Sequence, residues 1–217
     1  MKPILIGVSG NAGVGKDTTA DILVKHFGFT KVSFADELKR TAMRWYGFTV
    51  EQLWGPSEMR NTPSPKYPHL ICRDVLQKLG TEVGRHIEGM TWVNITLGVV
   101  EELISDDRLT YSYAQGIGMA MSKMHRRGVV ISDVRWPAGN EGRAIKDAGG
   151  KLVRIIRHDA KPLDVNSAGH PSEANVDVSQ DIFDFSILNV TEQGLAKGDL
   201  PRGLGLAVAT MMEKIHG

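Results

Sequence analysis

The sequence predicts a three-layer α/β fold, in which a mainly parallel sheet of five short strands lies between layers of helices. Short, continuously apolar runs such as residues 3–8 and 128–133 are typical of strands buried on both faces of a parallel sheet. Segments with the three-to-four-residue apolar spacing of helices separate these runs. This alternation of strand and helix is the pattern of a doubly wound domain.

The elements can be placed in order along the chain. The expected strands are residues 3–8, 31–34, 128–133, 152–157 and 185–190. The expected helices are residues 18–27, 35–46, 69–87, 92–104, 141–148 and 204–215. Gly28 should end the first helix, and the four prolines in residues 55–68 should exclude regular structure there. Residues 105–123 form an insertion whose structure the pattern does not indicate.

The composition excludes several classes of protein. The chain has 217 residues, enough for one sizeable domain with an insertion or lid. Its 26 basic and 25 acidic residues leave a net charge of +1, which does not favour binding to a nucleic acid polymer. The single cysteine, Cys72, cannot form an internal disulfide, and no apolar run is long enough for a signal peptide or a membrane helix. We therefore expect a cytoplasmic protein.

The segment between the first strand and the first helix has the spacing of a phosphate-binding loop, Gly-x-x-x-x-Gly-Lys. Its glycines let backbone N–H groups approach a phosphate closely, and the N-terminus of the following helix adds roughly half a positive charge. Lys16 supplies a full charge. The residues expected to contact a nucleoside triphosphate are Gly10, Asn11, Ala12, Gly13, Val14, Gly15, Lys16, Asp17 and Thr18.

The residue after the lysine is unusual for such a loop. A serine or threonine hydroxyl ordinarily binds Mg²⁺ at this position, but here the residue is Asp17. A carboxylate can bind Mg²⁺ directly or through water, and we favour a metal or phosphate-site role. The alternative is that Asp17 caps the helix and Thr18 supplies the hydroxyl.

A second set of candidates lies at the carboxyl end of the strand predicted for residues 128–133. Asp133 and Arg135 are two residues apart, so they share a face at the carboxyl end of a strand, which is the ligand end of a parallel sheet. Arg135 suits bidentate phosphate binding, and Asp133 suits Mg²⁺ through water or an acceptor hydroxyl. The alternative interpretation is that Asp133 and Arg135 form a purely structural pair at the end of the strand.

The predicted helix 69–87 has two distinct faces. The stripe expected to face a core comprises Ile71, Val75, Leu76, Leu79, Val83 and Ile87. The opposite face carries Arg73, Gln77, Gly80, Thr81 and Gly84. Each mid-helix glycine costs about 1 kcal/mol relative to alanine, so we expect either a nucleotide base or another helix to approach them closely. Trp92 would stack on a base or, more commonly for a lone tryptophan, belong to the core.

Together these residues resemble the deoxynucleoside monophosphate kinases of tailed bacteriophages, a branch of the P-loop nucleoside monophosphate kinases. The likeness rests on Gly-Lys-Asp-Thr-Thr-Ala at 15–20, Ser-Phe-Ala-Asp at 33–36, Leu-Gln-Lys-Leu-Gly-Thr at 76–81, Trp-Val at 92–93, Asp-Val-Arg at 133–135, Asn-Glu at 140–141 and His-Pro-Ser-Glu at 170–173. The chain departs from the pattern at Ala138 and Gly139, which appear as an insertion, and in the length of residues 105–123.

The resemblance implies transfer of the γ-phosphoryl group of ATP to a deoxynucleoside monophosphate (dNMP), with Mg²⁺. It implies one P-loop kinase domain over residues 1–217, with a monophosphate-binding region at about 36–104 and a lid at about 158–184. Lys16, Asp17 and Arg135 would be catalytic. The monophosphate pocket would comprise Arg73, Gln77, Gly80, Thr81, Trp92, Asp133, Arg135 and Glu141.

Several alternatives stay open at this point. An arginine among Arg154, Arg157 and the pair Arg126-Arg127 would complete the phosphate cage, whereas His170 is more simply a solvated loop residue. The alternative acceptors are dephospho-coenzyme A and phosphomevalonate, and the alternative to a kinase is a nucleotide-switched binding module. The oligomeric state, including a homodimer, is open, and a phage-encoded protein would work in the host cytosol.

Overall fold

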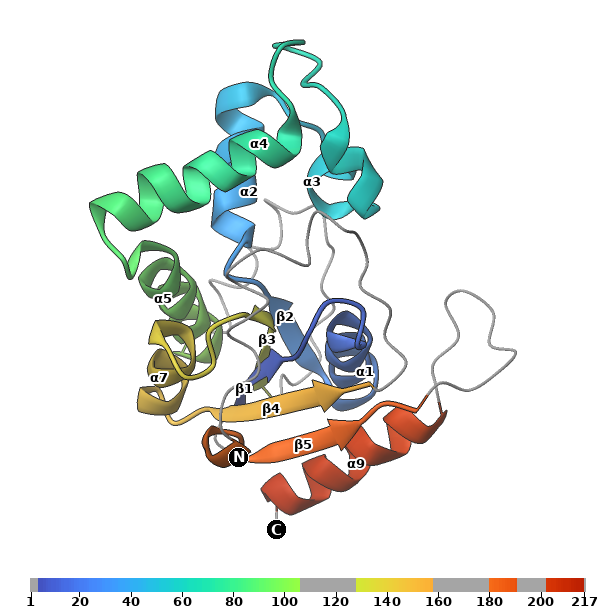
Figure 1. Ribbon diagram of the computed structural model, residues 1–217. Coiled ribbons are helices and arrows are strands. Elements are labelled where there is room, and N and C mark those ends of the chain that lie inside the picture. The colour runs from blue at the N-terminus through green and yellow to red at the C-terminus, as the bar shows by residue number, and fades with distance from the viewer. Residues whose placement is uncertain (1–3, 106–127, 158–179, 191–201, 217) are drawn as a thin grey trace. The chain divides into compact units, whose positions relative to one another are not determined.

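The computed structural model describes residues 4–105, 128–157, 180–190 and 202–216 (Figure 1). The strands are β1 (Ile4–Ser9), β2 (Phe29–Val32), β3 (Gly128–Val134), β4 (Lys151–Ile156) and β5 (Phe185–Leu188). They form a five-stranded sheet in the order β2-β3-β1-β4-β5, and each neighbouring pair runs parallel. The predicted parallel five-stranded sheet is therefore confirmed.

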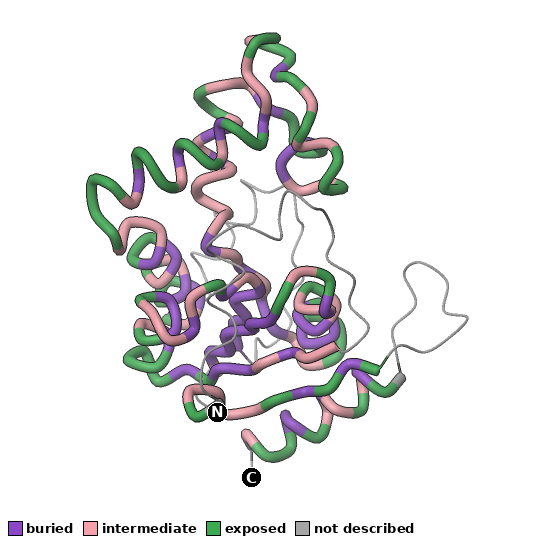
Figure 2. Tube along the Cα trace, viewed as in Figure 1, coloured by how far each residue is buried: buried purple, intermediate pink, exposed green. Residues whose placement is uncertain are grey.

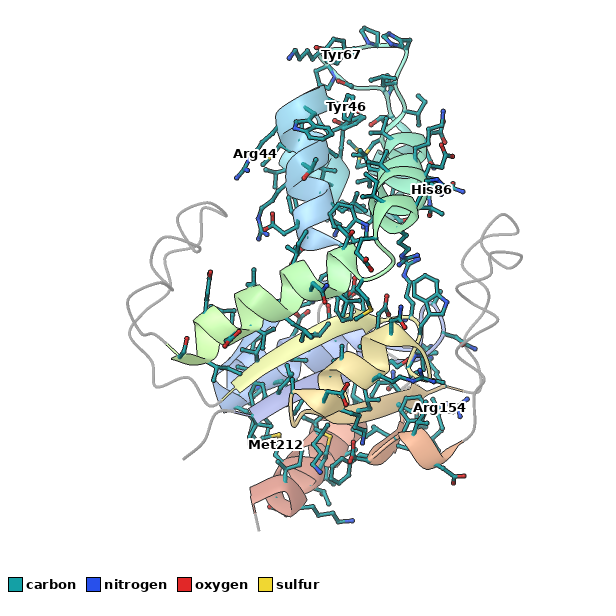
Figure 3. All side chains as sticks on the ribbon, turned by 90° about the vertical axis from the view of Figure 1, so that its left-hand side faces the viewer. Arg44, Tyr46, Tyr67, His86, Arg154 and Met212 are labelled. Carbon is teal, nitrogen blue, oxygen red and sulfur yellow. The ribbon has the colours of Figure 1, made fainter. Side chains whose placement is uncertain are left out.

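Helices cover both faces of this sheet. Helices α1 (Lys16–Phe27) and α9 (Arg202–His216) pack on one face, where Leu23, Leu204 and Met212 join the buried strand residues. Figure 2 shows buried residues along the strands, and Figure 3 labels Met212 on α9. Helix α7 (Asn140–Asp147) lies on the other side of the strands (Figure 1). Its Ile145 is fully buried and occupies the space beside Gly7, where an added Cβ would lie 2.6 Å from the Ile145 side chain. The three layers are confirmed.

The chain divides into two compact units. Unit 1 comprises Met1–Val32 and Val99–Gly217 and contains the sheet, and unit 2 comprises Ser33–Gly98. The helical elements that begin in unit 2 are α2 (Asp36–Tyr46), α3 (Val50–Trp54), the 3-10 segment Ser57–Asn61, α4 (Cys72–Gln77), the π-helical segment Lys78–Arg85 and α5 (Thr91–Ser105). Helix α5 continues into unit 1. Unit 2 has its own buried cluster, which comprises Ala42, Phe48, Leu53, Cys72, Val75 and Leu79.

Strand β2 of unit 1 and helix α3 of unit 2 differ from the prediction. Strand β2 begins at Phe29, two residues earlier than predicted, because Phe29 is buried and pairs with Gly128 of β3. Helix α3 was not predicted. Thr49 and Gln52 form a capping box at its N-terminus, with each side chain bound to the backbone N–H of the other residue. That Thr-x-x-Gln spacing is a start signal for a helix of only five residues.

The helix predicted over 69–87 begins at Cys72 and becomes π-helical from Lys78 to Arg85. A π-helix has more residues per turn, so a stripe spaced for an α-helix leaves the core as the segment proceeds. Val75 and Leu79 are buried as predicted, but Val83 is 43% exposed and Ile87 78% exposed. The predicted stripe is therefore wrong beyond Leu79.

The proline-containing stretch 55–68 also holds more structure than expected. Residues Ser57–Asn61 form a 3-10 helix, which is tolerated because the prolines at 56 and 63 flank the segment rather than interrupt it. The insertion beyond Ser105 and residues 158–179 of the expected lid lie outside the described residues. Within the described ranges, no helix has both the length and the apolar character needed to cross a bilayer.

Asp184, just before β5, joins three parts of unit 1 and gives a testable stability effect. Its carboxylate accepts from Leu152 N–H at 2.8 Å and pairs with Lys146 and with Lys151. Partial burial alone would raise the pKa of Asp184, but the hydrogen bonds from Lys146 and Leu152 and the charges of both lysines outweigh burial and lower the pKa below its ordinary value.

Because the folded pKa is lowered, Asp184 stabilises the fold above the unfolded pKa of about 3.9, and this contribution is lost as pH falls through the folded pKa. We expect D184N to melt about 2–4 °C below wild type at pH 7, a loss on the order of 1 kcal/mol after solvent screening of the lysines. The gap should shrink toward pH 3 in thermal unfolding followed by circular dichroism. A gap that stays constant or widens on acidification would contradict the prediction.

Candidate active site

The phosphate loop follows β1 at the carboxyl edge of the sheet. Gly10 and Gly15 adopt φ values of +146° and +104°, which side-chain-bearing residues rarely reach. At Gly10 an added Cβ would also lie 2.5 Å from the Ile155 carbonyl oxygen of β4. Glycine is therefore required there both by backbone conformation and by the close approach of the neighbouring strand.

Lys16 begins α1 and directs its side chain back over the loop. Its Nζ donates to the carbonyl oxygens of Gly10 and Asn11, each at 2.7 Å. Thr19, one turn further on, fixes the start of the helix by donating from Oγ1 to the Gly15 carbonyl at 3.0 Å. The single positive charge of Lys16 thus lies at the loop, next to the positive end of the α1 dipole.

Asp17 is exposed in the first turn of α1 and forms an ion pair with a lysine of the adjacent strand. Lys31 Nζ of β2 lies 2.9 Å from Asp17 Oδ1 and 3.0 Å from Asp21 Oδ1, one turn apart on α1. Burial of Lys31 alone would lower its pKa, but the hydrogen bonds and charges of Asp17 and Asp21 outweigh that effect and raise the pKa. Lys31 therefore stays charged and balances one of the two carboxylates.

The ends of β1 and β3 are aligned at the same edge. Ser9 pairs with Val134, and its Oγ donates to the Val134 carbonyl oxygen at 2.9 Å. Gly10 and Arg135 therefore leave the sheet side by side. The half-buried Asp133 and the exposed Arg135 belong to this edge, as the sequence predicts.

Glu141 is almost completely buried, at 4% exposure, and its carboxylate contacts the backbone. Its Oε2 accepts from the N–H groups of Arg135 at 2.6 Å and Trp136 at 3.0 Å. The turn that contains Ala138 and Gly139 therefore still returns the first turn of α7 to the segment that carries Arg135. The sequence alone suggests only an acidic residue near a helix N-terminus, and it does not indicate this contact with the preceding turn.

The residues after β4 and β5 also approach the loop. Arg157 Nη1 lies 3.5 Å from the Gly13 carbonyl oxygen, whereas the Arg154 guanidinium lies 5.7 Å from the centre of the Phe183 ring. Asn189 donates from Nδ2 to the Val14 carbonyl oxygen at 2.8 Å. Nothing in the sequence pattern singles out Asn189, because one polar residue after a strand is common. Arg126, Arg127 and His170 lie outside the described residues.

The remaining candidates for the monophosphate site belong to unit 2. Arg73 is exposed, and its Nε donates to Asn61 Oδ1 at 2.7 Å. Gln77 and Thr81 are exposed on the same segment. Trp92 Nε1 donates to the Gly80 carbonyl oxygen at 3.0 Å.

The two glycines of this segment have different neighbours. The Trp92 ring fills the space that a side chain at Gly84 would need, whereas a Cβ at Gly80 would lie 3.3 Å from Leu38. Close packing within unit 2 therefore accounts for Gly84, and Gly80 is bounded by Leu38 on one side.

The sequence and the fold were compared with those of known proteins. No family model matches the chain. It is 33% identical over 173 residues to a protein of Acanthamoeba polyphaga mimivirus named "Putative deoxynucleotide monophosphate kinase", a match that covers 80% of this chain and 82% of that protein. Among solved structures, TT1252 from Thermus thermophilus has a TM-score of 0.50 at 17% identity, with all of both chains covered. A dephospho-CoA kinase from Campylobacter jejuni has a TM-score of 0.48 at 15% identity, with 97% and 96% covered.

A glycine loop with its lysine, at the carboxyl end of the central strand of a parallel sheet, defines a P-loop nucleotide-binding protein. With the relationship to the viral protein, the chain is a P-loop kinase, an enzyme that transfers a phosphoryl group from ATP. It belongs to the deoxynucleotide monophosphate kinase family, of which the mimivirus protein is a member.

Proposed function

We propose that the chain transfers the γ-phosphoryl group of ATP to the 5′-phosphate of a dNMP, with a deoxynucleoside diphosphate and ADP as products. The observation that carries the proposal is the extent of the similarity to the mimivirus protein. The match covers 173 residues, more than unit 1 contains, so it includes part of unit 2 as well as unit 1. The likeness to the phage branch of the family supports the same acceptor.

On the donor side, the backbone N–H groups from Gly10 to Lys16 would bind the phosphates of ATP, and the Lys16 ammonium would lie between the β- and γ-phosphates. Mg²⁺ fits the carboxylates available here. It ordinarily takes one or two carboxylates with phosphate oxygens and water, and Asp17 and Asp133 both belong to unit 1 near the loop. When bound, Mg²⁺ would neutralise charge on the phosphate oxygens. Within the described residues, no group of three or more His, Cys, Asp or Glu side chains gathers as a metal site.

On the acceptor side, Arg135 would bind the 5′-phosphate, with Glu141 fixing the backbone of Arg135 through the N–H contact. By the resemblance to the phage enzymes, Arg73, Gln77, Gly80, Thr81 and Trp92 would also bind the monophosphate. The acceptor oxygen is already ionised at neutral pH, so no general base is required. Catalysis then depends on alignment of donor and acceptor and on stabilisation of the charge that develops on the transferring group.

An ADP-release assay tests the acceptor. Purified protein with ATP and Mg²⁺ should release ADP rapidly when one or more of the four dNMPs is added, and slowly with ATP alone. The same assay with ribonucleoside monophosphates, dephospho-coenzyme A and phosphomevalonate identifies the other acceptors considered above. Stimulation by one of those compounds without any stimulation by a dNMP would overturn the proposed substrate, and no stimulation by any acceptor would favour a nucleotide-switched binding protein.

The proposed role of Asp17 can be separated from its ion pair with Lys31. Asp21 has the same lysine partner at nearly the same distance but lies one turn further along α1. If Asp17 acts on Mg²⁺ or phosphate, D17N should raise the Mg²⁺ concentration needed for half-maximal activity about tenfold, and D21N should leave it unchanged. Equal effects of the two substitutions would show that Asp17 acts only through Lys31.

A further inference from the structure

Asn189 directly follows β5 and connects the end of that strand to the phosphate loop. The residue is 7% exposed, and its backbone N–H donates to the Ile156 carbonyl oxygen at the end of β4 at 2.8 Å. Its Nδ2 donates to the Val14 carbonyl oxygen, also at 2.8 Å. Because the partner is a carbonyl oxygen, only the NH₂ end of the amide can make this bond. The backbone of Asn189 is thus held by the sheet, and its side-chain amide is bound to the phosphate loop.

This bond fixes the orientation of the Val14–Gly15 peptide group. A peptide group is planar and trans, so its carbonyl oxygen and its N–H point in opposite directions. With the Val14 oxygen bound to Asn189, the Gly15 N–H must point away from Asn189. If this peptide rotated by half a turn, a carbonyl oxygen would take the place of that N–H and would repel an anion.

The conformation of Gly15 makes such a rotation a real alternative. Glycine at φ +104° has few steric restrictions, so the backbone on either side of it can turn easily. Asn189 also fills the space next to Gly15, because an added Cβ there would lie 2.6 Å from Nδ2. The buried side chain of Asn189 therefore restrains the loop at Gly15, where it joins α1.

We infer that Asn189 is a positioning residue for the donor site, which keeps the Gly15 N–H directed at the phosphates of ATP. It acts through the Val14–Gly15 peptide and does not itself contact the phosphates. The inference rests on the proposed donor role of the phosphate loop and is independent of the acceptor.

Calorimetric titration with ATP and Mg²⁺, without any acceptor, tests this role. N189D is nearly isosteric, but its carboxylate cannot donate to the Val14 oxygen at neutral pH, so we expect the Kd for ATP to rise about tenfold or more. N189A removes the bond without adding charge and should raise the Kd about fivefold. Asn94 is exposed on α5, so N94D is a matched control that should bind ATP as wild type does.

Steady-state kinetics gives a second measurement, which would not change in the same way if Asn189 only stabilised the fold. Both Asn189 variants should raise the KM for ATP while the KM for the acceptor stays unchanged, and thermal unfolding shows which variants are folded. If N189D does not fold, N189A alone decides. If the folded Asn189 variants had a Kd for ATP within twofold of wild type, or if N94D lost as much affinity as they do, the role of Asn189 would be overturned but the donor site would stand. A wild-type protein that binds no ATP would overturn the donor site itself.

Discussion

Replacing Lys16 with alanine is expected to lower kcat/KM about 100- to 1000-fold while the protein stays folded. The Lys16 ammonium gives the phosphate loop a full positive charge, and its Nζ donates to the carbonyl oxygens of Gly10 and Asn11. Removing a group that stabilises charge in the transition state typically costs two to three orders of magnitude in rate, on the order of 3–4 kcal/mol. The measurement is the ADP-release assay at saturating acceptor.

Lys25 provides the matched control for this experiment. It is an exposed lysine in the last turn of the same helix, so K25A removes an equal charge far from the loop. K25A should retain wild-type turnover, and both variants should show wild-type circular dichroism. If K16A were nearly as active as wild type, the assignment of residues 10–16 as the donor site would be wrong.

Replacing Arg135 with alanine is expected to raise the KM for the acceptor and lower kcat, with a combined loss of about 100-fold, while the KM for ATP changes little. The residue leaves the sheet next to Gly10, and Glu141 binds its backbone N–H at 2.6 Å. R135K keeps the charge but loses the two-pronged geometry of the guanidinium, so we expect an intermediate loss of about tenfold.

Arg143 serves as the comparison for Arg135. It is exposed on α7, and R143A removes the same charge from the same turn-and-helix segment. R143A should keep the wild-type KM for both substrates. If R135A and R143A gave equal effects, or if R135A changed only the KM for ATP, Arg135 would not be the acceptor-phosphate residue.

Features that depend on local pattern were predictable from the sequence. Strands β1 and β3 are short apolar runs with no competing interpretation, and Gly28 ends α1 in the left-handed conformation that favours glycine. The phosphate loop was recognisable because its function requires particular residues at fixed spacing. The position of Asp133 and Arg135 at the carboxyl end of a parallel strand was also predictable, whereas their role stays a prediction.

Features that depend on distant contacts were not predictable. The π-helical turn at Lys78–Arg85 leaves Ile87 exposed, although its spacing fits an α-helical stripe. The partner of Asn189 lies 175 residues earlier in the chain. Asp17 was considered as a metal ligand or a helix cap, but its ion pair with Lys31 depends on how β2 packs against α1. In each case the decisive neighbour comes from another element, which local spacing cannot specify.

The single cysteine of the chain gives unit 2 a built-in chemical probe. Cys72 is fully buried in the unit 2 cluster. Burial raises the pKa of its thiol more than the charges of Arg60, Arg73 and Lys39 lower it. A thiol reagent should therefore modify the native enzyme only during transient opening of unit 2, because the reactive thiolate is scarce and inaccessible in the closed state. The rate of modification thus measures the opening free energy of that unit in the unaltered protein, separately from the sheet that carries the phosphate loop.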